Sequence, residues 1–165
     1  MKRRQLKILF VCLGNICRSP AAEEIMRSLV EENHCDDTIA CDSAGIIDAN
    51  VGSAPNSTMK YHAGRRGYRL SGIARQLDPG TDFEGFDYIV TMDEMVDSQV
   101  RSLAPNADYL SRVHGMTDFC RTMDEVAVPD PYYGTGDDFE RVLDILEDAC
   151  LGLFEQVIRR GGFDK

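Results

Sequence analysis

Residues 8–20 read Ile-Leu-Phe-Val-Cys-Leu-Gly-Asn-Ile-Cys-Arg-Ser-Pro and constrain the fold more than any other segment. The apolar run at their start predicts a buried strand, and Pro20 is typical of the first turn of a helix. Cys12 and Arg18 enclose five residues, so they stand at the two ends of the intervening loop. A strand, a short loop and a helix in this order can hold an anion with loop N–H groups and the positive end of the helix.

The residue types in this loop suit phosphate chemistry. A thiol at Cys12 would ionise easily among positive partial charges, and the Arg18 guanidinium can grip two phosphate oxygens. Gly14 permits a close backbone approach, Asn15 suits a left-handed turn, and Ser19 can donate a hydrogen bond to the thiolate. The plainer alternative is an ordinary strand, turn and helix with Cys12 as a small core residue. The agreement of several features favours the phosphate loop.

Length and charge bound the class of protein. The chain has 165 residues, which is the size of one domain with its own core, so we expect a single domain over 1–165. The net charge of −10 disfavours a general binder of nucleic acid or of anionic membranes. An anionic substrate must therefore be caught by a local basic site. We expect a monomer with no nucleic-acid or membrane partner.

Cysteine usage points to a reducing compartment. There are six cysteines, but no pair has the C-x2-C spacing, and the three histidines are scattered, so we expect no metal and no cofactor. The chain is long enough not to need disulfides, and one thiol is expected to be reactive, so we predict a cytoplasmic location. No apolar stretch has the length of a membrane span.

Periodicity and turn residues predict alternating strands and helices. The strands are expected at 7–12, 38–44, 87–92 and 110–114, and the helices at 18–33, 57–66, 93 or 94–103, and 136–160. This alternation predicts an α/β fold, with a four-stranded parallel sheet and helices on both faces. Ligands of such sheets lie beyond the carboxyl ends of the strands, which is where Cys12 stands.

Residues 128–134 supply a second candidate group. Asp130 lies between two prolines, so its backbone is stiff and biased away from helix. A rigid carboxylic acid at a pocket mouth can protonate the oxygen that leaves a phosphate ester. Tyr132 and Tyr133 can form an aromatic wall. The alternative is a proline-bounded surface turn without a function.

Several segments together resemble the low-molecular-weight protein tyrosine phosphatases. They are Val-Cys-Leu-Gly-Asn-Ile-Cys-Arg-Ser-Pro at 11–20, Asp-Ser-Ala-Gly at 42–45, Ala-Arg-Gln at 74–76, Asp-Tyr-Ile at 87–89, Met-Asp at 92–93 and Asp-Pro-Tyr-Tyr-Gly at 130–134. The resemblance covers essentially the whole chain. It implies hydrolysis of phosphotyrosine or small aryl phosphates through a phosphocysteine, without a metal.

The resemblance also implies a role for each matching residue. Cys12 would be the nucleophile, Arg18 the phosphate clamp and Asp130 the general acid. Ser19 would stabilise the thiolate, while Asn15 and Ser43 would brace the loop. Substrate would contact the loop N–H groups and the pocket walls, from Leu13, Gly14, Asn15, Ile16, Cys17, Ser19, Ala49, Tyr132 and Tyr133.

Two positions depart from the family pattern and leave substrate preference open. Ala49 is the residue that we align with a large aromatic side chain of the pocket wall. Gly72 stands where mammalian-type members have a histidine, so Asp93 would lack that partner and no supporting role is assigned to it. Neither departure touches the expected chemistry.

Three alternative functions remain open. A protein arginine phosphatase would have threonine where Ile16 stands, because an apolar branched side chain crowds the polar atoms of a guanidinium. A thiol-coupled arsenate reductase would need relay cysteines in mid-chain, yet none lies between Cys41 and Cys120. An inactive phosphotyrosine-binding module would not need Cys12, Arg18 and Asp130 together.

Cys17 adds a regulatory hypothesis. A loop that curls around phosphate brings Cys12 and Cys17 close together, and we expect their sulfurs to come within reach of a disulfide. An easily oxidised Cys12 could then be trapped by Cys17 as a reversible disulfide. The alternative is that Cys17 is a buried structural residue.

Overall fold

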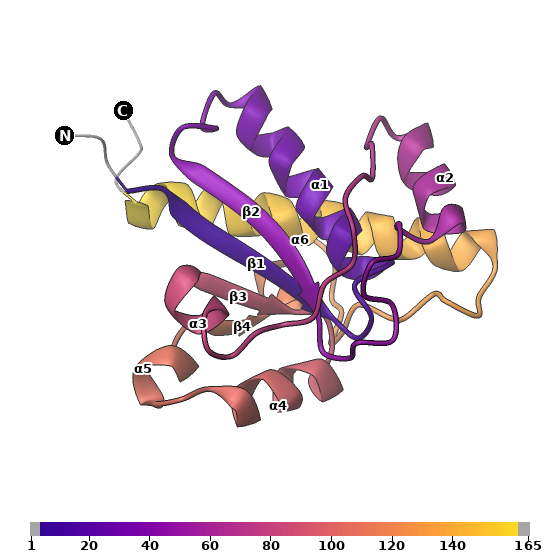
Figure 1. The fold of residues 1–165 in the computed structure, drawn as a ribbon. Coiled ribbons are helices and arrows are strands. Elements are labelled where there is room, and N and C mark those ends of the chain that lie inside the picture. The colour runs from indigo at the N-terminus through magenta and orange to yellow at the C-terminus, as the bar shows by residue number, and fades with distance from the viewer. Residues whose placement is uncertain (1–3, 162–165) are drawn as a thin grey trace.

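A parallel sheet of four strands forms the centre of the computed structural model, which describes residues 4–161 (Figure 1). The ends of the expected domain, 1–3 and 162–165, lie outside the described residues. The strand order is β2-β1-β3-β4, and every pairing is parallel, as predicted. The strands are β1 (Leu6–Cys12), β2 (Ile39–Gly45), β3 (Tyr88–Thr91) and β4 (Val113–Gly115).

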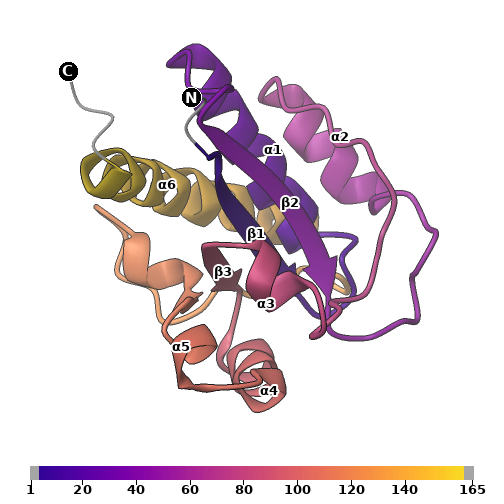
Figure 2. The same cartoon turned by 60° about the vertical axis from the view of Figure 1, so that its left-hand side comes forward.

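Helices cover both faces of this sheet, also as predicted (Figures 1 and 2). Strand β1 has side chains without solvent exposure on both faces, so its sequence reads as a continuous apolar run. Ile8 and Phe10 belong to one core cluster, whereas Leu9 and Val11 belong to the other. One face carries α1 (Arg18–Glu32), α2 (Ser57–Arg65) and α6 (Gly136–Gly161), and the other carries α3 (Asp82–Gly85), α4 (Glu94–Leu103) and α5 (Ala107–Leu110).

Helix α6 is the longest helix of the described chain and closes the larger core. Its apolar positions keep helical spacing, and ten of its residues are buried. Asp137 and Asp138 lie in its first turn and Arg159 and Arg160 in its last, where their charges complement the helix dipole. The helix packs along α1, and the Cys150 thiol donates to the Ala22 carbonyl oxygen at 3.6 Å.

The prediction of a strand at 110–114 was wrong at its start. Leu110 ends α5, and β4 begins at Val113. The Asn106 side chain accepts from the Tyr109 N–H at 3.1 Å, and this cap starts a helical turn where apolar content suggested a strand. The short helices α3, α5 and η1 (Met116–Phe119) were not predicted, because four residues are too few to show a helical period.

Candidate active site

The loop between β1 and α1 is held from behind by one buried amide. Asn15 adopts the left-handed conformation, with φ of 58°. Its Nδ2 donates to the hydroxyl oxygens of Ser19 and Ser43, both at 2.9 Å. Its Oδ1 accepts from the Arg75 N–H at 2.9 Å, which fixes which end of the amide faces the serines. Asn15 thus ties the loop to β2 and to the segment that follows α2.

These contacts also set the direction of the neighbouring hydroxyl protons. Ser43 Oγ accepts from Asn15 and donates to Glu23 Oε1 at 2.6 Å. Ser19 Oγ likewise accepts from Asn15, so its own proton is free for Cys12 Sγ, 2.9 Å away. The Asn15 N–H lies 3.3 Å from the same sulfur and donates to it. Two donors therefore face Cys12, and both stabilise negative charge on its sulfur.

Glu23 anchors the far end of this hydrogen-bond chain. It lies on α1, and Arg27 Nη1 reaches its Oε2 at 2.5 Å, one helical turn on. Burial raises the pKa of the Glu23 carboxyl above its ordinary value of 4.5, against the lowering effects of Ser43 and Arg27. Sequence reasoning missed Glu23 and Arg27. The i, i+4 pairing of their charges was the available signal.

Arg18 is a buried guanidinium held by two other elements. Only 2% of the residue is exposed, so its charge needs partners inside the protein. Its Nη1 donates to Asp93 Oδ2 at 2.7 Å and to the Val128 carbonyl oxygen at 2.9 Å. Its Nη2 lies 3.7 Å from Asp130 Oδ2. The first two contacts fix the plane of the guanidinium and leave Nη2 directed toward Asp130.

The structure gives Asp93 a role that the sequence analysis withheld. Asp93 follows β3 and caps α4, because its Oδ1 accepts from the Val96 N–H at 2.8 Å. The other carboxylate oxygen holds Arg18. The absence of a histidine at Gly72 therefore does not leave Asp93 without a partner. A carboxylate directly after a parallel strand was the signal that could have identified it.

The segment that carries Asp130 is anchored at one end and open at the other. The Val128 N–H donates to the Met92 carbonyl oxygen at 2.8 Å, next to β3. The Asp130 side chain is 45% exposed, and its Oδ1 accepts from the Tyr132 N–H at 3.1 Å. The rings of Tyr132 and Tyr133 meet edge to face with centroids 4.7 Å apart, and both are exposed.

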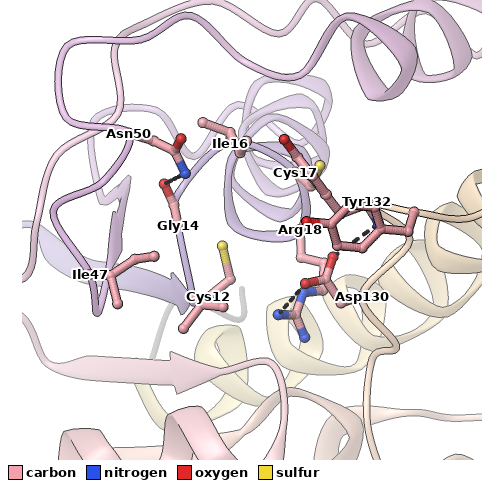
Figure 3. A pocket seen from close by; sticks show the side chains of 11 residues that line it. Cys12, Gly14, Ile16, Cys17, Arg18, Ile47, Asn50, Asp130 and Tyr132 are labelled. Atoms are coloured by element: carbon pink, nitrogen blue, oxygen red, sulfur yellow. Dashed lines mark hydrogen bonds and ion pairs between the residues drawn. The ribbon is translucent and has the colours of Figure 1, made fainter.

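These groups surround one cavity of about 240 Å³ at the carboxyl end of β1 (Figure 3). Cys12, Arg18 and Asp130 line it, and so do most of the predicted contact residues: Leu13, Gly14, Ile16, Cys17, Tyr132 and Tyr133. Asn15, Ser19 and Ser43 lie behind the loop and brace it. The cavity combines a thiol, a guanidinium and a carboxylate with an aromatic wall. That set can bind a phosphate ester and transfer its phosphoryl group.

Ala49 does not belong to this cavity, so its expected place in the pocket wall was wrong. Ile47 and Asn50 line the pocket instead, and Ala49 is exposed. The Ile47 N–H donates to the Leu13 carbonyl oxygen at 3.0 Å, which draws the Ile47 side chain against the loop. In Figure 3 Ile47 lies across the pocket from Tyr132. A turn of this kind has no periodicity from which the inward residue could be read.

The Asn50 side chain lies close against Gly14. Its Nδ2 donates to the Gly14 carbonyl oxygen at 3.4 Å. A Cβ at Gly14 would lie 2.5 Å from that Nδ2, so a larger residue would push Asn50 away from the loop. The close approach of the Gly14 backbone to a ligand stays a prediction.

The two cysteines of the loop have different environments. Both are buried, and both line the cavity. Burial, together with the negative charges of Cys12 and Asp130, raises the pKa of the Cys17 thiol to about 12. Cys17 is therefore almost entirely protonated at neutral pH, so we do not expect it to be the first thiol to react.

Among residues 4–161, no group of three or more histidine, cysteine or acidic side chains is placed to hold a metal ion. No helix in that same part of the chain is long and apolar enough to cross a membrane.

Comparison with known proteins identifies the family. Residues 7–161 match the family model of the low molecular weight phosphotyrosine protein phosphatases. The Synechocystis sp. protein slr0328 is 44% identical over 145 residues, which are 88% of this chain and 92% of that protein. A crystal structure of a protein tyrosine phosphatase from Entamoeba histolytica, with Hepes in its active site, superposes with a TM-score of 0.91. That structure is 41% identical and covers 96% of this chain and 99% of its own.

The site brings a cysteine and an arginine of one loop to the same cavity. The chain belongs to the low molecular weight phosphotyrosine protein phosphatase family. The fold extends to proteins of another stated activity. A mutant of the YwlE arginine phosphatase superposes with a TM-score of 0.80 over 92% of this chain and 95% of its own. Its identity is 23%, so the likeness concerns the fold alone.

Proposed function

We propose that this protein hydrolyses phosphotyrosine in proteins through a phosphocysteine intermediate, without a metal. The observation that carries the proposal is the meeting of Cys12, Arg18 and Asp130 in one cavity with an aromatic wall. Each of the three supplies a group that the reaction needs. The family of the chain supports the same substrate class.

In the first step the Cys12 thiolate attacks phosphorus, and the bond from phosphorus to the tyrosine oxygen breaks. The Ser19 hydroxyl and the Asn15 N–H face the attacking sulfur and can donate to it. Arg18 and the loop N–H groups neutralise charge on the three equatorial oxygens as the loose transition state forms. Because Asp93 and Val128 already fix Arg18, the guanidinium does not need to reorganise during the step.

Asp130 handles the proton in both steps. As a carboxylic acid it protonates the leaving phenolate oxygen, and it becomes a carboxylate. The carboxylate then takes a proton from a water molecule that attacks the phosphocysteine, releasing inorganic phosphate and the Cys12 thiolate. The partial exposure of Asp130 suits this role, because water and the departing tyrosine must both reach it.

The pocket walls favour an aryl ester over a phosphorylated guanidinium. Ile16 and Ile47 present apolar surface to the space beyond the phosphate site, and Tyr132 faces them. A phenyl ring packs well against such surfaces, whereas the N–H groups of a guanidinium would find no acceptors there.

The proposal is tested by comparing kcat/KM for matched peptides that carry phosphotyrosine, phosphoserine or phosphoarginine. We expect the phosphotyrosine peptide to be hydrolysed fastest. Acid quenching during turnover should trap phosphate on Cys12, and Cys12→Ser should lose turnover while it still binds vanadate. Preference for phosphoarginine, or a Cys12→Ser enzyme with a tenth of the wild-type rate, would overturn the assignment.

We also propose that the chain acts as a single domain over residues 1–165, as a cytoplasmic monomer. All six cysteines are free thiols, which suits a reducing compartment. Sedimentation at micromolar concentration should give the mass of one chain.

A further inference from the structure

One segment of this acidic chain has the opposite charge. Residues 49–77 contain five lysines and arginines and no aspartate or glutamate, although the whole chain carries a net charge of −10. The segment comprises the turn that carries Asn50, helix α2 and the stretch that returns to the sheet. Such a separation of charge creates a local positive potential on an otherwise negative surface.

Three of the five cations are available to a partner. Arg66 contacts three carboxylates of α6, and Arg75 contacts two carboxylates near β2 and α3, so both are neutralised within the protein. Lys60, Arg65 and Arg69 are exposed, and none of them forms an ion pair with residues 4–161. We call these three residues the α2 basic face.

Two residues of the α2 basic face border a depression in the surface. Lys60 and Arg69 line a depression of about 290 Å³ between α2 and the stretch that follows it, together with Tyr68 and Leu70. Leu70 is buried and forms an apolar floor. The guanidinium of Arg65, also on α2, lies over the Tyr61 ring, 5.9 Å from its centroid. A bound segment could therefore meet cations at the rim and apolar surface below.

The face is within reach of a substrate held in the catalytic pocket. The Asn56 N–H, just before α2, donates to the carbonyl oxygen of the pocket residue Ile16 at 2.8 Å. From there the nine residues of α2 extend for about 13 Å, at 1.5 Å per residue. Figures 1 and 2 show the stretch after α2 returning beside it toward the carboxyl ends of the strands. An extended peptide covers that length in about four or five residues.

We propose that the α2 basic face binds an acidic stretch of the protein substrate, about four to eight residues away from the phosphotyrosine. This proposal rests on the proposed function, because it names the substrates that the same pocket would prefer. A short acidic peptide fits better than a long polyanion. Nucleic acid or an anionic membrane would extend beyond three cations onto the negative remainder of the surface.

The test compares two phosphotyrosine peptides that differ in one feature. The first peptide carries four glutamates at positions four to eight residues from the phosphotyrosine, and the second carries glutamines at the same positions. One such pair places them on the N-terminal side of the phosphotyrosine, and another pair places them on the C-terminal side. At low salt, for one of the two placements, we expect kcat/KM of the glutamate peptide to exceed that of its glutamine control by about three- to tenfold. The factor is small because exposed ion pairs are individually weak. The preference should fall as salt rises. Hydrolysis of p-nitrophenyl phosphate is the control, because this small substrate occupies the catalytic pocket and has no peptide that reaches the α2 basic face.

Two double variants that remove the same charge distinguish binding at the α2 basic face from an effect of the overall charge of the protein. Lys60→Gln with Arg69→Gln should lose most of the preference for the glutamate peptide and keep the wild-type rate on p-nitrophenyl phosphate. Arg159→Gln with Arg160→Gln removes the same charge at the far end of α6 and should keep the preference. An acidic peptide without phosphotyrosine should compete with the glutamate substrate and leave p-nitrophenyl phosphate hydrolysis unchanged.

Equal rates on the glutamate and glutamine peptides, or an equal loss in both double variants, would overturn the proposed docking. In that result, continued hydrolysis of the glutamine peptide would leave the proposed function intact. Loss of all activity toward phosphotyrosine peptides in the wild-type protein would instead refute the proposed function. Tighter binding of a short oligonucleotide than of the acidic peptide to the same face would refute the choice of a protein partner.

Discussion

Asp93 uses its two carboxylate oxygens on two different structures: one caps helix α4, and the other lies 2.7 Å from Nη1 of the buried Arg18. We predict that Asp93→Asn lowers kcat/KM for aryl phosphates by about tenfold. This is the lower end of the effect expected for losing a hydrogen bond to a charged group, because the Val128 carbonyl oxygen still accepts from Arg18 Nη1. Asparagine also caps helices well, so the α4 cap should be kept, and the loss of unfolding free energy should be on the order of 1–3 kcal/mol from the buried Arg18 charge.

Asp93→Ala separates these two roles in the same assays. Asp93→Ala removes the helix cap as well as the charge. We therefore expect its free energy of unfolding, measured by urea denaturation, to be about 1 kcal/mol lower than that of Asp93→Asn. Wild-type kinetics for Asp93→Asn would show that Arg18 needs no carboxylate behind it.

Asp130→Asn should slow the release of basic leaving groups much more than that of acidic ones. An amide cannot give up a proton, so alkyl-substituted phenyl phosphates should lose about 10²–10⁴-fold in kcat/KM, whereas nitrophenyl phosphates lose far less. The measurement is a plot of rate against leaving-group pKa, which should be steeper for Asp130→Asn than for the wild type. Parallel plots would argue that Asp130 has no part in proton transfer.

Glu23 should make folding stability depend on pH in a defined direction. Burial raises the pKa of its carboxyl, so the native state holds a proton that the unfolded chain releases above pH 4.5. Its contribution is therefore complete below the unfolded pKa and is lost as pH rises through the raised native value. Glu23→Gln should remove this loss, because glutamine does not titrate and its carbonyl oxygen can still accept from Ser43.

Urea denaturation of both proteins at a series of pH values checks the Glu23 prediction. The unfolding free energy of the wild type should fall relative to Glu23→Gln as pH rises above 4.5. A difference that stays constant would mean that folding does not change the pKa of Glu23, and the opposite trend would mean that folding lowers it.

Cys17 should protect Cys12 from irreversible oxidation. Mild peroxide should convert the Cys12 thiolate to a sulfenic acid, and the Cys17 thiol should then condense with it, forming a disulfide and releasing water. The high pKa of Cys17, about 12, means that it is not the first thiol oxidised. Peptide mapping should find a Cys12–Cys17 link that reductant removes.

Cys17→Ser provides the comparison for this redox step. It should hydrolyse substrate but recover much less activity after peroxide and then reductant. Equal recovery of Cys17→Ser and the wild type, or the absence of the linked peptide, would make Cys17 a structural residue.

The sequence predicted the elements and site residues that can be recognised from residue type and from the spacing of apolar residues. Strand β1 and helix α1 were readable because apolar runs and helical stripes are local signals, and Cys12 and Arg18 followed from their spacing. Ile47, Asn50 and Asp93 were missed because their roles depend on which way a turn faces or on which strand lies next to which. Such relationships form only when distant segments pack.

The origin of helix α1 at Arg18 has a consequence for how this protein can diverge. The loop would have to absorb any residue inserted between Cys12 and Arg18, because packing keeps the buried Ile25 and Met26 of α1 against the core. A bulge there would move the loop N–H groups relative to Cys12 and Arg18, whose positions other elements hold. Evolution can therefore exchange side chains in this loop more readily than it can change the length of the loop.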